Sequence, residues 1–217
     1  MLQKKYKSKN FTSLSDQINV HYYANFLTNH KADKYYAILE QKLTYNSAEE
    51  SKVKIFGKEH LIPRQQVAYG DPGTYYSFAG IKVEARPWND KDDIICRILK
   101  NIKHKVELFT GYKFNFVLIN KYKDGDQYIG LHKDDEKELG DAPTIVGVSL
   151  GAVRDVTFKA TDVIPTTFPN TLSLELEHGS IFVMYHPTNQ YWKHSIPKRA
   201  HIKKSRISLT FRTLNKI

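Results

Sequence analysis

Two residues near the middle of the chain have the types and the spacing of metal ligands. His132 and Asp134 are separated by a single residue. In an extended strand, residues i and i+2 point to the same face and lie roughly 6.6 Å apart along the chain, so an imidazole and a carboxylate can converge on one ion. Of the nine histidines, only His132 is followed two residues later by an aspartate. The same spacing also occurs in pairs that hold no metal, so the hypothesis depends on a third ligand.

Three other histidines are candidates for that ligand: His178, His186 and His194. His194, which stands twelve residues before Arg206, is the preferred one, although spacing alone does not choose among the three. Two histidines and one carboxylate on one face of a metal leave three positions open for a cosubstrate and oxygen. That arrangement suits non-haem Fe(II).

The segment 206–212 alternates like a strand with one apolar and one polar face. The apolar face has Ile207, Leu209 and Phe211. The polar face has Arg206, Ser208, Thr210 and Arg212. If the polar face lines a cavity, Arg206 offers a forked donor to a dicarboxylate cosubstrate; the alternative is a solvated outer face. Six residues of strand span roughly 20 Å, so both arginines reach one small ligand only if their side chains lean inward.

A second pair of polar side chains precedes His132. Asn120 and Tyr122 share one face as the chain enters a turn at Gly125. Their side chains could hydrogen-bond the carboxylate or keto group of a ligand. The alternative is that both are ordinary strand and turn residues.

The elements that must position these residues are mostly short strands. Residues 20–45 predict helical turns, and one amphipathic helix is predicted from about 94 to 106, with Asn89 or Asp90 as its N-cap and Gly111 as its stop. Strands are predicted over 53–56, 74–78, 114–120, 128–133, 145–150, 153–159, 172–177, 180–185 and 206–212. Many short strands after one or two helices predict an antiparallel sandwich or jelly roll backed by helices.

Composition limits the classes of function. A chain of 217 residues suits one domain, and no stretch is apolar for long enough to span a membrane. Cys96 is the only cysteine, which excludes an internal disulfide and a Cys-based zinc site and favours a reducing intracellular compartment. The net charge of +10 favours a polyanion such as nucleic acid as partner, although many basic proteins bind none.

In their order, these motifs resemble the AlkB family of demethylating dioxygenases, and within it the animal branch that repairs alkylated duplex DNA. The likeness covers about residues 51–217 and rests on 114–125, His132-Lys-Asp-Asp-Glu136, His186-Pro-Thr-Asn189, His194 and Arg206-x5-Arg212. It implies an α+β fold: a double-stranded β-helix (jelly roll) with N-terminal helices and a nucleotide-recognition lid at about 51–90. Residues 1–50 would then be an extension that is partly helical and carries a basic arm.

The resemblance also implies a reaction. Fe(II) would be bound by His132, Asp134 and His194. 2-Oxoglutarate would be held by Asn120, Tyr122, Arg206, Thr210 and Arg212, with Arg206 at the distal carboxylate. The enzyme would demethylate 1-methyladenine and 3-methylcytosine in DNA oxidatively and release formaldehyde, succinate and CO2. The chemistry belongs to the metal and cosubstrate, and the protein supplies geometry.

The substrate residues follow from the same resemblance. Because a paired base cannot reach a buried iron, it must be flipped out, and an apolar side chain can fill the gap. Phe56 matches this finger, beside Gly57 and Lys58, although by itself it would be a core aromatic. The lid over the flipped base would use Tyr76, Ser77 and Phe78, and Arg64 falls near the DNA or the lid. Asp135 and Glu136 would face the cationic damaged base; the alternative is a solvated acidic turn.

One departure concerns the strand preference. The sequence of segment 161–169 is free of basic residues, where the duplex-repair branch has a basic loop. Lys198, Arg199, Lys203 and Lys204 form a nearby cluster that compensates in part. The alternative function is therefore an AlkB-type demethylase of RNA or single strands. A catalytically inactive binding module would require the loss of a metal or cosubstrate residue, and none is lost. We expect a monomer in the nucleus, with no membrane association.

Overall fold

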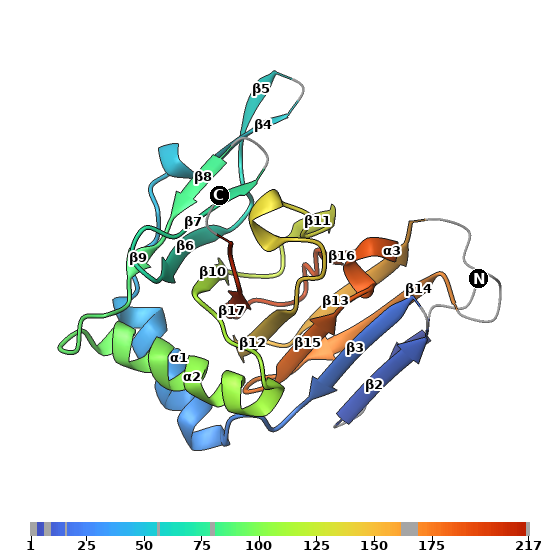
Figure 1. The fold of residues 1–217 in the computed structure, drawn as a ribbon, viewed down its shortest axis with the longest axis horizontal. Coiled ribbons are helices and arrows are strands. Elements are labelled where there is room, and N and C mark those ends of the chain that lie inside the picture. Colours follow the sequence, from blue (N-terminus) through green and yellow to red (C-terminus); the bar gives the residue numbers. More distant parts are fainter. Residues whose placement is uncertain are drawn as a thin grey trace.

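Two facing β-sheets form the body of the protein (Figure 1). The computed structural model describes residues 4–6, 10–15, 17–55, 57–78, 81–161 and 169–215. The larger sheet has eight strands, in the order β2 (Asn10–Ser15), β3 (Ile18–Tyr23), β15 (Ile181–Tyr185), β12 (Ile145–Gly151), β17 (Arg206–Arg212), β10 (Phe116–Tyr122), β6 (Gln65–Gly70) and β9 (Arg86–Pro87). The smaller sheet has five, in the order β1 (Lys4–Tyr6), β14 (Thr171–Leu176), β13 (Arg154–Ala160), β16 (Trp192–Ile196) and β11 (Ile129–His132).

Two helices cover the outer face of the larger sheet. They are α1 (Asn29–Lys42) and α2 (Ile94–Thr110), and their buried side chains join those of β6, β10, β12 and β17 in one apolar cluster. The N-cap of α2 is Asp93, whose carboxylate accepts from the amide of Ile95 at 2.7 Å. Asp90 instead accepts from the amides of Asp92 and Asp93 in the preceding turn, so the predicted N-cap was wrong. Gly111 ends the helix with a φ of 78°, which confirms the predicted stop.

A second apolar cluster fills the space between the sheets. It includes Phe116 and Leu118 from the larger sheet and Phe158, Leu172 and Trp192 from the smaller one. The predicted jelly roll, a sandwich of mainly antiparallel strands, is therefore confirmed. Within the described residues, no helix is long and apolar enough to cross a membrane.

The alternation predicted for segment 206–212 is present in β17. Ile207, Leu209 and Phe211 point outward into the cluster beneath the helices. The polar side chains of the same strand line a pocket between the two sheets. One strand therefore contributes to the core on one face and to the candidate site on the other.

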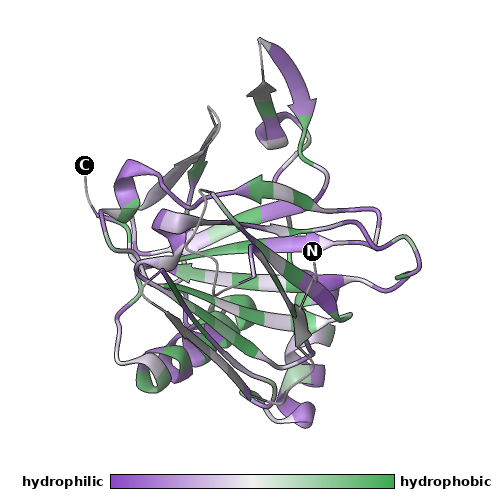
Figure 2. Ribbon diagram, turned by 90° about the vertical axis from the view of Figure 1, so that its right-hand side faces the viewer, coloured by the Kyte–Doolittle hydropathy of each residue, from purple (hydrophilic) through white to green (hydrophobic). Residues whose placement is uncertain are grey.

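Two hairpins extend from the body beside the pocket. One pairs β4 (Lys52–Ile55) with β5 (Lys58–Leu61), and the other pairs β7 (Tyr75–Phe78) with β8 (Ile81–Glu84). The β4–β5 hairpin projects well away from the sheets (Figure 2). Short helical turns lie at η1 (Glu49–Ser51), η2 (Lys137–Leu139) and α3 (Thr188–Tyr191).

The first fifty residues contain more than the helical turns predicted for 20–45. Residues Ile18–Tyr23 form β3, which pairs with β15 inside the larger sheet. The strand alternates between buried and half-buried side chains, a period-2 pattern overlooked beside the apolar residues of α1. The two lysines of the predicted basic arm that are described, Lys4 and Lys5, lie in β1 along β14.

Candidate active site

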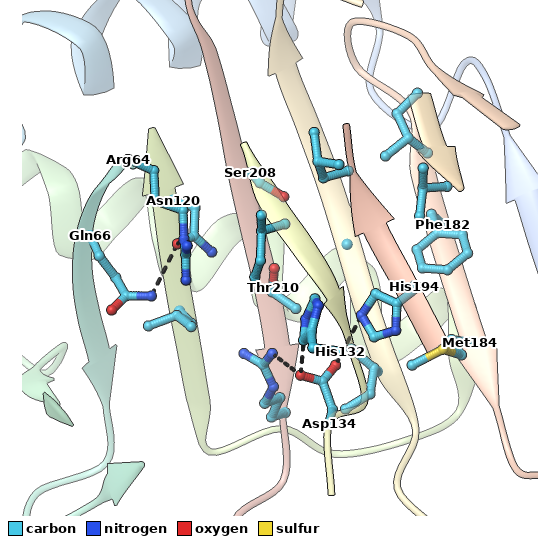
Figure 3. Close-up of a pocket in the computed structure, with 18 of the residues that line it drawn as sticks. Arg64, Gln66, Asn120, His132, Asp134, Phe182, Met184, His194, Ser208 and Thr210 are labelled. Atoms are coloured by element: carbon cyan, nitrogen blue, oxygen red, sulfur yellow. Dashed lines mark hydrogen bonds and ion pairs between the residues drawn. The ribbon is translucent and has the colours of Figure 1, made fainter. Parts of the chain in front are cut away.

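The candidate metal ligands come from three positions around one end of the pocket. His132 ends β11, His194 lies in β16, and the two residues are direct partners in the register of these antiparallel strands. Asp134 follows β11. One donor atom from each residue lies within 4.8 Å of the other two. The Asp134 carboxylate is 4.0 Å from Nε2 of His132 and 3.6 Å from Nε2 of His194 (Figure 3).

The surroundings keep His194 and Asp134 in their metal-binding protonation states. Burial and the neighbouring His132 lower the pKa of His194 to about 3, so its ring is neutral at physiological pH. Burial would raise the pKa of Asp134, but the guanidinium of Arg212 and the two histidines hold that pKa below its usual range. Neutral imidazole and ionised carboxylate are the forms that bind a metal.

The backbone around Asp134 is fixed by a buried amide side chain. Oδ1 of Asn189 accepts from the amide of Asp134 at 2.9 Å, and Nδ2 of Asn189 donates to the carbonyl of Asp134. Asn189 lies in α3, directly before the strand that carries His194. Asn189 is part of the motif His186-Pro-Thr-Asn189. The sequence did not predict a role for it, because its partner Asp134 lies far away in the chain.

The two competing histidines lie elsewhere. Nδ1 of His178 accepts from the amide of Gly151 at 2.8 Å, and its Nε2 lies 3.2 Å from Asp33. His186 is exposed. Among the described residues, the only group of three or more His, Cys, Asp or Glu side chains placed to hold a metal is His132, Asp134 and His194.

Arg206 lies at the other end of the polar face of β17. Its side chain is 2% exposed, and its Nη2 donates to the hydroxyls of Ser149 at 2.9 Å and Ser208 at 3.3 Å. Nε and Nη1 are buried without a hydrogen-bond partner among the described residues. Burial lowers the pKa of Arg206 to about 10, so the group stays cationic at neutral pH. A buried, partly unsatisfied guanidinium that faces a cavity suits a carboxylate ligand.

The two arginines of β17 have different partners. Arg212 donates to the Asp134 carboxylate at 2.9 Å and therefore lies at the metal end. Thr210 lines the pocket from the same strand, between Ser208 and Arg212. The two arginines therefore lie at opposite ends of the polar face of the strand, with Ser208 and Thr210 between them.

Asn120 and Tyr122 both lie in the pocket wall, on β10 beside β17. Oδ1 of Asn120 accepts from Nε of Arg64 at 2.9 Å and from Nε2 of Gln66 at 3.0 Å. Arg64 is thus buried inside the pocket and not on an outer surface. Gln66 was not predicted, and β6 shows no alternation of burial that would have signalled it.

The residues fit the metal and the cosubstrate that the sequence implies. Two imidazoles and one carboxylate are the donor set of non-haem Fe(II) sites. The unsatisfied guanidinium atoms of Arg206 supply a cation for a distal carboxylate. Both features line a single pocket, together with Asn120, Tyr122 and Thr210.

The predicted substrate residues lie in several places. The Tyr76 hydroxyl is buried 3.5 Å from the Asp134 carboxylate, and Cζ of Arg212 lies 4.8 Å from the Tyr76 ring. Glu136 lines the pocket, and burial raises its pKa to about 7. Asp135 is exposed. Ser77, in β7, is half-buried, and the strand also includes Phe78.

The predicted finger belongs to the projecting hairpin. Gly57 and Lys58 are exposed there, and Gly57 has a φ of 78°. Phe56 lies outside the described residues.

Comparison with known proteins defines the class first. A family model described as the 2OG-Fe(II) oxygenase superfamily matches residues 19–212. Two solved structures share the fold. One, titled "The structure of OsALKBH1", aligns with a TM-score of 0.54 and 15% identity over 92% of this chain and 99% of that chain. The other, a prolyl hydroxylase in complex with a peptide fragment, from Trichoplax adhaerens, aligns with a TM-score of 0.57 and 10% identity over 90% of this chain and 83% of that chain.

Curated relatives narrow the class. The chain is 41% identical over 187 residues to "DNA oxidative demethylase ALKBH2" of Bos taurus, which covers 85% of this chain and 65% of that protein. The protein of the same name from Homo sapiens has the same identity, with 69% of its length covered. The human "Alpha-ketoglutarate-dependent dioxygenase alkB homolog 3" is 32% identical over 159 residues, which cover 70% of this chain and 52% of that protein. The chain therefore belongs to the AlkB family of 2OG-Fe(II) oxygenases, and it spans about two thirds of the bovine and human ALKBH2 proteins.

Proposed function

We propose that this chain is a direct-reversal DNA repair enzyme that demethylates N-alkylated bases, such as 1-methyladenine and 3-methylcytosine, oxidatively. Its main support is one pocket in which three metal donors face a buried guanidinium with unsatisfied donors. The relatives named DNA oxidative demethylase support the choice of substrate.

In this proposal, His132, Asp134 and His194 hold Fe(II). Arg206 binds the distal carboxylate of 2-oxoglutarate, and the other polar groups assigned to the cosubstrate are Asn120, Tyr122, Thr210 and Arg212. The bound metal and cosubstrate supply the oxidation of the N-methyl group by oxygen, with release of formaldehyde, succinate and CO2. Arg212 keeps the Asp134 carboxylate ionised and oriented.

A base must leave the duplex to enter this pocket. Phe56, which follows β4 in the sequence, would fill the gap in the stack, and Gly57 and Lys58 would lie beside the neighbouring nucleotide and phosphate. Tyr76, Ser77 and Phe78 of β7 would form the lid above the base. Glu136 lines the pocket, and the ionised form of this acidic side chain would favour a cationic methylated base over a neutral one. Asp135 and Arg64 complete the proposed contacts.

A nuclear location belongs to the same proposal, because genomic DNA would be the substrate, and the proposed enzyme is a monomer. RNA or single-stranded nucleic acid is the competing substrate. The observation in its favour is the absence of basic residues from the sequence of segment 161–169. The hairpin favours a duplex instead, because a side chain that fills a stacking gap serves paired DNA.

One assay tests the proposal and its competitor together. The protein is given Fe(II) and 2-oxoglutarate with methylated single-stranded DNA, duplex DNA or RNA of one sequence, at a stated salt concentration. Formation of succinate and formaldehyde with loss of the methyl group is expected, with DNA preferred over RNA. Turnover of RNA alone would support the competing function, and no methyl loss from any of the three would contradict the proposal.

A further inference from the structure

Arg154, at the start of β13, is one of the most deeply buried cations of the protein. It is 1% exposed, and neither the metal nor the cosubstrate assignment involves it. Its Nη1 donates to the carbonyl of Asp124 at 2.9 Å, and its Nη2 donates to those of Gln127 at 2.8 Å and Pro197 at 2.7 Å. One guanidinium therefore joins three backbone carbonyls of two separate loops.

These two loops connect the strands that carry the candidate site. The loop with Asp124 and Gln127 runs from β10 to β11, and therefore from Tyr122 towards His132. The loop that begins at Pro197 runs from β16 to β17, and therefore from His194 to Arg206. Arg154 thus connects both routes between the metal end and the cosubstrate end of the pocket.

The loops also contact each other directly. The amide of Gly125 donates to the carbonyl of Ile202 at 2.8 Å, and the amide of Arg199 donates to the carbonyl of Gly125 at 2.7 Å. A Cβ atom at Gly125 would lie 1.7 Å from the carbonyl oxygen of Arg199. The close approach of the two backbones is what brings their carbonyls within reach of one guanidinium.

Arg154 also reaches the cosubstrate end through Tyr122. Its Cζ lies 5.4 Å from the centre of the Tyr122 ring, and Cζ of Arg206 lies 5.5 Å from the same ring. Tyr122 and Arg206 are direct partners in the register of β10 and β17. Three side chains therefore form a contiguous set, with the tyrosine ring in contact with both cations.

The carboxylates of Asp155 and Asp124 lie close enough to Arg154 to stabilise its charge. The groups that accept its hydrogen bonds are neutral carbonyls. The carboxylate of Asp155 also pairs with Arg199. Arg154 and Arg206 each place a cation beside the Tyr122 ring, and these cations favour a carboxylate ligand at this end of the pocket.

We propose that Arg154 is a positioning residue for 2-oxoglutarate: it fixes the Tyr122 ring and, through it, the guanidinium of Arg206. The inference rests on the proposed function, because it takes Arg206 as the anchor of the distal carboxylate. Arg154 does not line the pocket itself; it lies against the Tyr122 ring and acts through that ring.

The test measures binding and not turnover. Protein loaded with Mn(II) in place of iron is titrated with 2-oxoglutarate by calorimetry, for wild type, Arg154→Met, Arg154→Lys and the control Lys159→Met. Lys159 is an exposed cation on the same strand. Mn(II) affinity is measured separately, because a general loss of structure would weaken it as well.

Arg154→Met is expected to raise the Kd for 2-oxoglutarate on the order of 10-fold, while its Kd for Mn(II) stays within about twofold of wild type. The control Lys159→Met is expected to keep the Kd for 2-oxoglutarate within about twofold of wild type. Arg154→Lys is expected to weaken binding too, because an ammonium cannot reproduce the planar fork that reaches three carbonyls. If Arg154→Met does not fold, Arg154→Lys alone decides. An unchanged Kd for 2-oxoglutarate in the folded variants, or an equal loss of Mn(II) affinity, overturns the inference.

A double-mutant cycle with Arg206→Lys completes the test. If Arg154 acts through Arg206, the double variant Arg154→Lys/Arg206→Lys loses less affinity than the sum of the single losses. Additive losses would contradict this route. If wild-type protein binds no 2-oxoglutarate, it is the proposed function that fails.

Discussion

Asp134 has two roles that a measurement can separate. It is a candidate metal ligand, and it is also the partner of the buried guanidinium of Arg212. Asp134→Ala is expected to abolish turnover and, in metal-free protein, to lower the free energy of unfolding by about 3–5 kcal/mol, because Arg212 is left as an uncompensated buried charge.

His132→Ala is the matched control for this prediction. The His132 side chain is 31% exposed and has no such partner role for Arg212. The His132→Ala variant is expected to lose turnover. In urea unfolding with a chelator present, it is expected to keep most of the free energy of unfolding of the wild type. Full turnover in either variant would refute the metal assignment, and equal stability losses would refute the separation of roles.

Asn189 offers a second prediction at the scale of single residues. Asn189→Ala removes both hydrogen bonds to the backbone of Asp134, so the carboxylate is no longer held in place. The affinity for Mn(II) is expected to fall about 10- to 100-fold. The neighbouring exposed residue gives the control Gln190→Ala, which should bind Mn(II) like wild type. Unchanged affinity in Asn189→Ala would show that the loop holds Asp134 without it.

At the scale of elements, the contact between the two site loops depends on one glycine. Gly125→Ala places a Cβ 1.7 Å from the carbonyl oxygen of Arg199, so the loops must separate. A loss of about 1–3 kcal/mol in the free energy of unfolding is expected, together with weaker binding of 2-oxoglutarate. A Cβ added at Gly130 would meet no atom of the described residues within 4 Å, so Gly130→Ala is the control for stability. A stable Gly125→Ala variant with normal binding would contradict this account.

A further prediction concerns the finger proposed beside the projecting hairpin β4–β5. Phe56→Ala is expected to reduce repair of duplex DNA more than repair of single-stranded DNA, because only the duplex has a gap to fill. The comparison uses initial rates on both substrates. Leu61, which is 59% exposed on β5, gives the control Leu61→Ala. Equal losses on the two substrates would remove the finger role of Phe56.

Elements differed in how far the sequence could predict them. β17 was predicted with its correct faces, because Ile207, Leu209 and Phe211 alternate strictly with polar residues. β16 was not predicted, because Trp192–Ile196 follows no regular alternation of burial. The choice of His194 could not come from local spacing either. It depends on the pairing of β16 with β11, which places His194 opposite His132.

At the scale of the whole molecule, the net charge of +10 predicts salt-dependent binding of nucleic acid. The affinity for methylated DNA is expected to fall at least about 10-fold between about 50 and 200 mM salt, because counterions are released from the phosphates. Binding of 2-oxoglutarate, inside a buried pocket, is expected to change far less. If the affinity for DNA did not change with salt, the basic residues of the chain would not contact phosphate.

The class of the protein could be predicted because its motifs occur in a fixed order along the chain. The positions of Arg64 and Asn189 could not be predicted, because each depends on a partner from another strand or loop. Arg64 donates to Asn120, and Asn189 hydrogen-bonds to the backbone of Asp134. Polar residues that act within a pocket leave no periodic signal when their partners are distant. Only the packed sheets bring them together.

The two faces of β17 have a consequence for how the chain can change during evolution. Exchanges of similar side chains on either face preserve the arrangement, but the gain or loss of one residue within Arg206–Arg212 would turn every following side chain to the opposite side. The arginines would then enter the apolar layer beneath the helices, and the aliphatic residues would enter the pocket. We therefore expect related sequences to vary in residue type mainly on the apolar face of this strand, and to keep both its arginines and its length constant.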